Sequence, residues 1–151
     1  MKRSRYIYLC LYIATLVFIC FSSLQNGEAS GNLSGGITNV ICSILETALK
    51  IDIDESIMSL LVRKLIGHFG SYFLLGLWGI MYFVQLVKPT KGLIMSLSFG
   101  LIFSIIGELL QLLSDGRNCN VYDMMIDFSG VAISNLLIYL FIKRNDRRDK
   151  E

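Results

Sequence analysis

Four long apolar stretches alternate with more polar segments along this chain of 151 residues. A helix needs about 20 apolar residues to cross a bilayer, and each stretch is long enough. Because a bilayer holds no water to bond the backbone, we expect the stretches to be helices. The chain is therefore predicted to be an all-α integral membrane protein, a single domain over residues 1–151 with about four transmembrane helices. The predicted spans are residues 6–24, 65–87, 93–113 and 121–142.

The first connection, residues 25–64, is long enough to hold structure of its own. Its first part, residues 25–36, is rich in Gly, Ser and Asn and predicts a loop. From Thr38 onward, apolar residues recur at helical spacing and predict an amphipathic helix. A break at residues 51–56 follows, in which Asp54 is placed to cap a second helix that leads into the next span. The amphipathic helix either lies along the outer membrane surface or packs over the bundle.

Ionisable and amide side chains interrupt the apolar pattern near one end of the last three spans. An ionisable group costs roughly 2.5–3.5 kcal/mol at mid-bilayer, and such groups usually pair with each other and mark a functional site. With four spans, all of these groups fall at one depth, near the outer interface. They are His68 in the second span, Glu108 and Gln111 in the third, Arg117 in the short outer connection, and Asp123 and Asp127 in the fourth.

Small residues continue the helical stripes on which these polar groups lie. Gly100 and Ser104 share the face of Glu108 in the third span, and Gly130 and Ser134 share the face of the two aspartates in the fourth. Small residues let helix backbones approach closely in lipid. We therefore expect the polar groups to point at a helix interface rather than at acyl chains.

The distribution of basic residues predicts the orientation of the spans. Ten of the 14 Lys and Arg residues precede the first span, lie between the second and third, or follow the fourth, where residues 143–151 form a basic tail. These positions share one side of the membrane, and the positive-inside rule makes that side cytoplasmic, with both termini. We interpret the basic tail as an anchor beside anionic lipid and not as a nucleic-acid site. The expected partner is the lipid bilayer.

The four cysteines add little chemistry. Cys10 and Cys20 lie in the first span and are expected to be inert apolar residues. Cys42 and Cys119 both fall on the predicted outer side, and their spacing leaves open whether they form a disulfide. The sequence contains no metal-ligand cysteine pattern.

The polar groups suit three kinds of role, and the sequence leaves all three open. As a ligand or substrate site, Arg117 suits a phosphate or carboxylate, and Glu108 and His68 suit general acid–base catalysis. As a metal site, the carboxylates and the imidazole suit a divalent ion. As an internal network, Arg117 neutralises Asp123 or Glu108 and only fixes the hairpin. We assign no metal ligand and no cofactor at this stage.

The same segments resemble the VanZ-like family of small bacterial membrane proteins, over most of the chain. The family's Glu-x-x-Gln motif is matched by Glu108 to Gln111, and this match is specific in combination with the Gly-Arg…Asp…Asp/Asn…Gly pattern after it. Gly116, Arg117, Asp123, Asp127 and Gly130 match that second pattern. Residues 63–76 match the family's Arg-Lys…His-Phe…Tyr…Leu-Gly motif. Phe21-Ser22-Ser23-Leu24-Gln25 matches its Phe-Ser-Ser-Gln segment with Leu24 inserted. Many members carry Glu at the position of Ser71, Asp at that of Gly107 and His at that of Leu110.

The resemblance implies a multi-pass protein of the bacterial cell membrane, in a family whose namesake is associated with low-level resistance to teicoplanin. Our leading hypothesis is that the outer-leaflet polar pocket binds an anionic cell-wall or lipid-linked component, such as a lipid-linked cell-wall precursor. One alternative is a membrane enzyme that acts on a lipid-linked envelope substrate, with Glu108 and His68 as acid and base. The other is a structural or interaction protein in which the polar groups form a network only.

Overall fold

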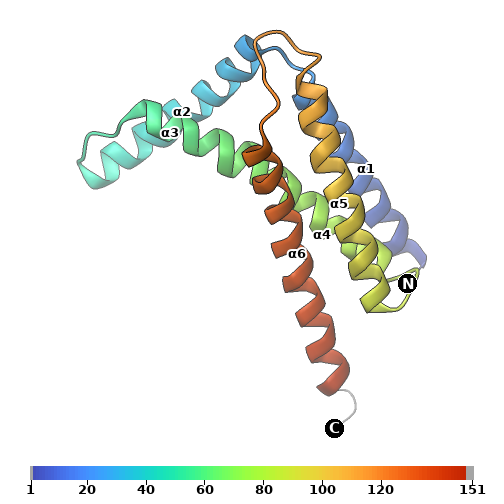
Figure 1. Ribbon diagram of the computed structural model, residues 1–151. Helices are drawn as coiled ribbons and strands as arrows, with labels where there is room; N and C mark the ends of the chain where they lie inside the picture. Colours follow the sequence, from blue (N-terminus) through green and yellow to red (C-terminus); the bar gives the residue numbers. More distant parts are fainter. Residues whose placement is uncertain (1, 149–151) are drawn as a thin grey trace.

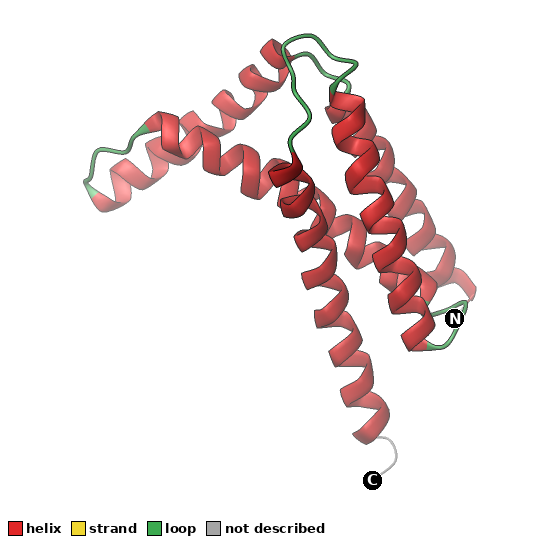
Figure 2. Ribbon diagram, viewed as in Figure 1, coloured by secondary structure: helices red, strands yellow, loops and turns green. Residues whose placement is uncertain are grey.

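The computed structural model describes residues 2–148, apart from the side chains of residues 2, 3 and 147. Residues 149–151, at the end of the predicted basic tail, lie outside the described residues. The described chain is all helical, with 85% of residues in helices, and it contains four helices long and apolar enough to cross a membrane. The predicted fold class is confirmed (Figure 2).

Four long helical segments form the body of the molecule, and a helical hairpin projects from its side (Figure 1). The second segment is one continuous bent helix of 29 residues. The order along the chain is α1 (Lys2–Ser23), α2 (Gly27–Leu49), α3 (Glu55–Leu61), the π-helix η1 (Val62–Gly70), α4 (Ser71–Phe83), α5 (Pro89–Gln111) and α6 (Val121–Arg148).

Both chain ends and the α4–α5 connection lie at one end of the body, at the bottom of Figure 1. The α1–α2 and α5–α6 connections meet at the opposite end, which we call the polar end. There the backbone N–H of Gly27 donates to the carbonyl of Asp115 at 2.9 Å. A Cβ added to Gly27 would lie 2.7 Å from the carbonyl oxygen of Gly116, so only glycine fits this crossing.

The span boundaries differ from the predicted ones by several residues. The second helix begins at Glu55, inside the predicted outer segment, and ends at Phe83 instead of residue 87. The third begins at Pro89, since proline suits the first turn of a helix, where its missing N–H has no partner to lose. The fourth continues to Arg148, because a helix can extend beyond the hydrocarbon layer into water with its basic residues solvated.

The predicted loop at residues 25–36 is wrong, because α2 already begins at Gly27. Asn26 caps this helix by accepting a hydrogen bond from the backbone N–H of Ala29 at 2.8 Å. Lys50, in a left-handed conformation, ends it. The predicted cap of the following helix is confirmed: Asp54 accepts from the N–H of Ser56 at 2.9 Å.

The small-residue stripes do lie at helix interfaces, as predicted. Ser104 and Ser134 are fully buried. A Cβ added to Gly130 of α6 would lie 2.5 Å from the carbonyl oxygen of Phe69 in η1. This close approach turns the polar face of α6 toward η1 and α5.

Candidate functional site

The π-helix η1 positions the imidazole of His68. This segment of nine residues contains Gly67 and Gly70 on either side of His68 and its neighbour. A π-helix is rare, occurs mostly as a short bulge inside an α-helix, and is frequent at functional sites. Here it turns His68 inward, where 9% of the residue is exposed, although Gly67 next to it lies on the exposed side.

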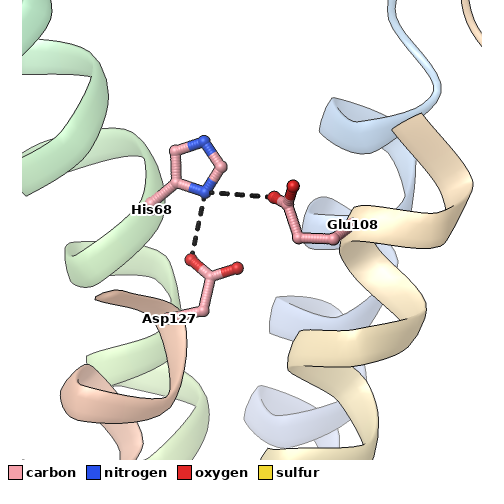
Figure 3. Close-up of side chains that lie close together, drawn as sticks. All are labelled: His68, Glu108 and Asp127. Atoms are coloured by element: carbon pink, nitrogen blue, oxygen red, sulfur yellow. Dashed lines mark hydrogen bonds and ion pairs between the residues drawn. The ribbon is translucent and has the colours of Figure 1, made fainter. Parts of the chain in front are cut away.

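Three side chains from three helices converge at this point (Figure 3). His68 Nδ1 lies 3.1 Å from Asp127 Oδ1 of α6 and 3.7 Å from Glu108 Oε1 of α5. The other ring nitrogen points away from both carboxylates. Glu108 is completely buried and Asp127 is 1% exposed. We call these three residues the triad.

The Glu108 carboxylate is held by donors on both oxygens. Gln111, one turn along α5, donates its amide Nε2 to Oε1, and the backbone N–H of Asn120 donates to Oε2 at 3.0 Å. Because Asn120 directly precedes α6, this bond also joins the two ends of the predicted polar hairpin. The spacing of Glu108 and Gln111 thus has a structural reason, which is the orientation of one carboxylate.

A second ion pair lies beside the triad. Lys64 Nζ of η1 lies 3.1 Å from Asp123 Oδ1, whose side chain is 8% exposed. In the network alternative, the sequence predicted that Arg117 neutralises Asp123 or Glu108. Within the described residues Arg117 forms no ion pair, because no carboxylate lies within 4.0 Å of it, and both carboxylates act on its charge only from farther away. Lys64 reaches Asp123 because η1 packs against α6.

Arg117 instead contacts the end of α1. Its Nη1 donates to the carbonyl oxygen of Ser22 at 2.9 Å. Carbonyls in the last turn of a helix have no partner within the helix and attract cations. Burial, and after it the positive charge of nearby Arg63, lower the pKa of Arg117 from its usual value. The guanidinium groups of Arg63 and Arg117 therefore lie close enough at the polar end to repel each other. Within the described residues, none of the five N–H donors of Arg117 reaches a carboxylate.

Both guanidinium groups line a cavity of about 840 Å³ between α1, α2 and the η1–α4 helix. Most of its wall is apolar. Its polar lining includes Ser22, Ser23, His68, Gln111, Arg117 and Asp127.

The structure brings all six candidate residues to the polar end, but it gives them different positions. His68, Gln111, Arg117 and Asp127 line the cavity, whereas Glu108 and Asp123 are not among its lining residues. Sequence reasoning missed three contributors: Arg63, Lys64 and the backbone N–H of Asn120. Arg63 and Lys64 come five and four residues before His68, and a spacing of four puts Lys64 on the same helix face as His68, so the sequence did contain a signal for Lys64. Cys42 and Cys119 are both free thiols in the structure.

Comparison with known proteins gives one positive result. The model of the VanZ/LLP1 family matches residues 6–142, which is nearly the whole chain and includes every residue of the site. A comparison with curated proteins and one with solved structures gave no match.

Proposed function

The chain belongs to the VanZ/LLP1 family, and we propose that it binds an anionic lipid of the outer leaflet in the cavity between α1, α2 and η1. The head group lies between Arg63 and Arg117, and the hydrocarbon chain lies along the apolar wall. The observation that carries this proposal is the cavity itself: its lining is mostly apolar and includes two arginines that form no ion pair within the described residues.

The head-group end supports a phosphate in particular. Arginine presents up to five N–H donors in a planar fork that matches phosphate oxygens. A negative group between Arg63 and Arg117 is attracted by both and relieves their mutual repulsion, which the more distant carboxylates of Glu108 and Asp123 offset only in part. Ser22 and Ser23 at the same end add small polar side chains.

The apolar lining supports a long hydrocarbon chain. Ligand pockets in proteins measure about 300–1,000 Å³ and are predominantly apolar, and the volume here is near the top of that range. The side chains that form the wall are Leu11, Phe18, Leu33, Ile37, Leu65 and Ile66.

The proposed leaflet follows from charge. The start of α1, the α4–α5 connection and the end of α6 lie at the end of the body opposite the polar end (Figure 1), and by sequence these segments include Arg5, Lys88, Lys91 and Arg144. By the positive-inside rule we place that end in the cytoplasm of a bacterial cell, so the polar end lies in the outer leaflet. Lipid-linked precursors of the cell wall carry a phosphate on a long hydrocarbon chain and reach this leaflet, and we propose them as the ligand class, with glycopeptide resistance as the phenotype.

A photo-crosslinkable prenyl phosphate tests the proposal on the purified full-length chain. Each charge-assisted hydrogen bond contributes about 1.5–3 kcal/mol, so Arg117→Ala should reduce labelling at low probe concentration by about tenfold or more. Arg63→Ala should reduce it less, because that side chain is exposed. The matched control is Arg144→Ala, which removes the same charge far from the cavity. Equal labelling of wild type and Arg117→Ala would refute lipid binding at this site.

A second function, catalysis on the bound lipid, is favoured by the triad. A histidine held between two carboxylates has the groups for general acid–base chemistry. On this proposal Glu108→Gln keeps lipid labelling and abolishes turnover. If purified wild type turns over no lipid-linked substrate, with or without added divalent metal, the chain is a binding protein and not an enzyme.

A further inference from the structure

The donor atoms of the triad lie at distances that suit a shared metal ion. One atom each from His68, Glu108 and Asp127 lies within 4.8 Å of the other two. Donors that share an ion at about 2.0–2.2 Å each are themselves roughly 3–4 Å apart. The 3.1 Å and 3.7 Å separations from His68 Nδ1 to the two carboxylate oxygens are of that size.

With both carboxylates ionised, the charges of the triad do not balance without a further cation. Two carboxylates with side chains 0% and 1% exposed face a single imidazole. A protonated His68 cancels only one of the two negative charges, and an uncompensated buried charge is costly. Within the described residues no Lys or Arg nitrogen lies within 4.0 Å of Glu108 or Asp127, since Lys64 pairs with Asp123.

We propose that His68 Nδ1, Glu108 and Asp127 bind one divalent metal ion of the manganese-to-zinc series. A doubly charged ion with a neutral histidine and two carboxylates gives a net charge of zero. One imidazole and two carboxylates without sulfur suit Mn²⁺, Fe²⁺ and Zn²⁺, all of which accept nitrogen and oxygen donors.

Three protein donors leave coordination positions open, as in catalytic and substrate-binding metal sites. His68 and Asp127 line the cavity, and the fully buried Glu108 does not, so on this proposal the ion is reached from the cavity. The metal site does not depend on lipid binding, because the three protein donors suffice to hold the ion.

Two neighbours of the triad hold the Glu108 carboxylate in a fixed orientation, as is usual for a carboxylate that binds a metal ion. Gln111 and the Asn120 N–H donate to its two oxygens and fix the plane of the group. Such partners of metal-binding carboxylates typically change metal affinity by about 10–100-fold when they are removed. Gln111 is therefore a positioning residue on this proposal.

The test is the metal content and Mn²⁺ electron paramagnetic resonance spectrum of purified full-length protein in detergent, without added lipid. Wild type incubated with Mn²⁺ or Zn²⁺ and then desalted should retain one ion per chain and show a higher thermal unfolding temperature than protein treated with chelator. Asp127→Asn and Glu108→Gln, which keep side-chain shape, should retain none. The matched control Asp123→Asn, beside the triad, should retain one.

If a triad variant does not fold, Gln111→Ala still tests the proposal, because it leaves all three metal donors in place. Its affinity for Mn²⁺ should fall by about 10–100-fold. Wild type that retains no ion, or an Asp127→Asn protein that retains as much as wild type, would overturn the proposal and leave the triad as a proton-sharing network. Arg117→Ala should retain the metal and lose lipid labelling, so failure of the metal site and failure of lipid binding are distinguishable.

Discussion

Lys64 Nζ lies 3.1 Å from Asp123 Oδ1, and this ion pair ties the π-helix η1 to the first turn of α6. The lysine side chain is 29% exposed and the aspartate side chain 8% exposed, so the pair is only partly shielded from its surroundings. Because Lys64 neutralises Asp123, Arg117 keeps its guanidinium group for the end of α1 and for the cavity.

Replacing Lys64 with methionine should destabilise the protein by about 1–2 kcal/mol, because the nearly buried Asp123 loses its charged partner. The measurement is unfolding in detergent followed by far-UV circular dichroism. Adding Asp123→Asn to Lys64→Met should restore part of the loss, since the unpaired charge is removed as well. Full additivity of the two changes would show that the pair does not contribute to stability.

Gly130→Ala should destabilise the protein by about 1–3 kcal/mol, because the new methyl group would meet the carbonyl of Phe69 and force α6 away from η1. Gly35→Ala in α2 is the matched control. A Cβ there meets nothing within 4 Å, so alanine should be neutral or stabilise the helix by about 0.5–1 kcal/mol. If both variants unfold at the same temperature as wild type, the η1–α6 interface is looser than the structure indicates.

The four spans and the position of the site could be predicted because both depend on local composition. A long run of apolar residues is enough to predict a transmembrane helix. The position of a polar residue within that run then predicts its depth in the bilayer, however the helices pack. The helix α2 could not be predicted over residues 27–36 in the same way. Its glycines lower helix propensity, but propensity is a weak term that the Asn26 cap and the crossing at Gly116 outweigh.

The partners within the site were harder to predict than its members. Whether Lys64 or Arg117 reaches Asp123 depends on how η1 is rotated about its axis, and the π-helical turns change that rotation by an extra residue. The cavity could not be predicted from the sequence for a related reason. It exists because the α2–α3 hairpin leaves the body at an angle, which no periodicity encodes.

The proposed orientation predicts that Cys119, in the α5–α6 connection, is modified by a membrane-impermeant maleimide added to intact cells. The test protein keeps Cys119 and has Cys10, Cys20 and Cys42 replaced by serine or alanine. Thr90→Cys in the same background lies at the opposite end of the body and should react only after the cells are opened. Reaction of position 90 in intact cells, with Cys119 protected, would invert the topology and place the cavity in the inner leaflet.

Susceptibility to teicoplanin and to other cell-wall antibiotics tests whether the cavity acts in envelope chemistry. A deletion strain complemented with wild type should differ from strains complemented with Arg117→Ala or Glu108→Gln, each at matched membrane abundance. Arg117→Ala should lose the effect because the head group loses a charged partner, and Glu108→Gln because the triad loses a carboxylate. Arg144→Ala should behave as wild type. If all variants behave as wild type, the polar end serves the fold alone. If the two site variants are less abundant and stabilised versions recover the effect, the polar groups form a structural network and the binding partner is another protein.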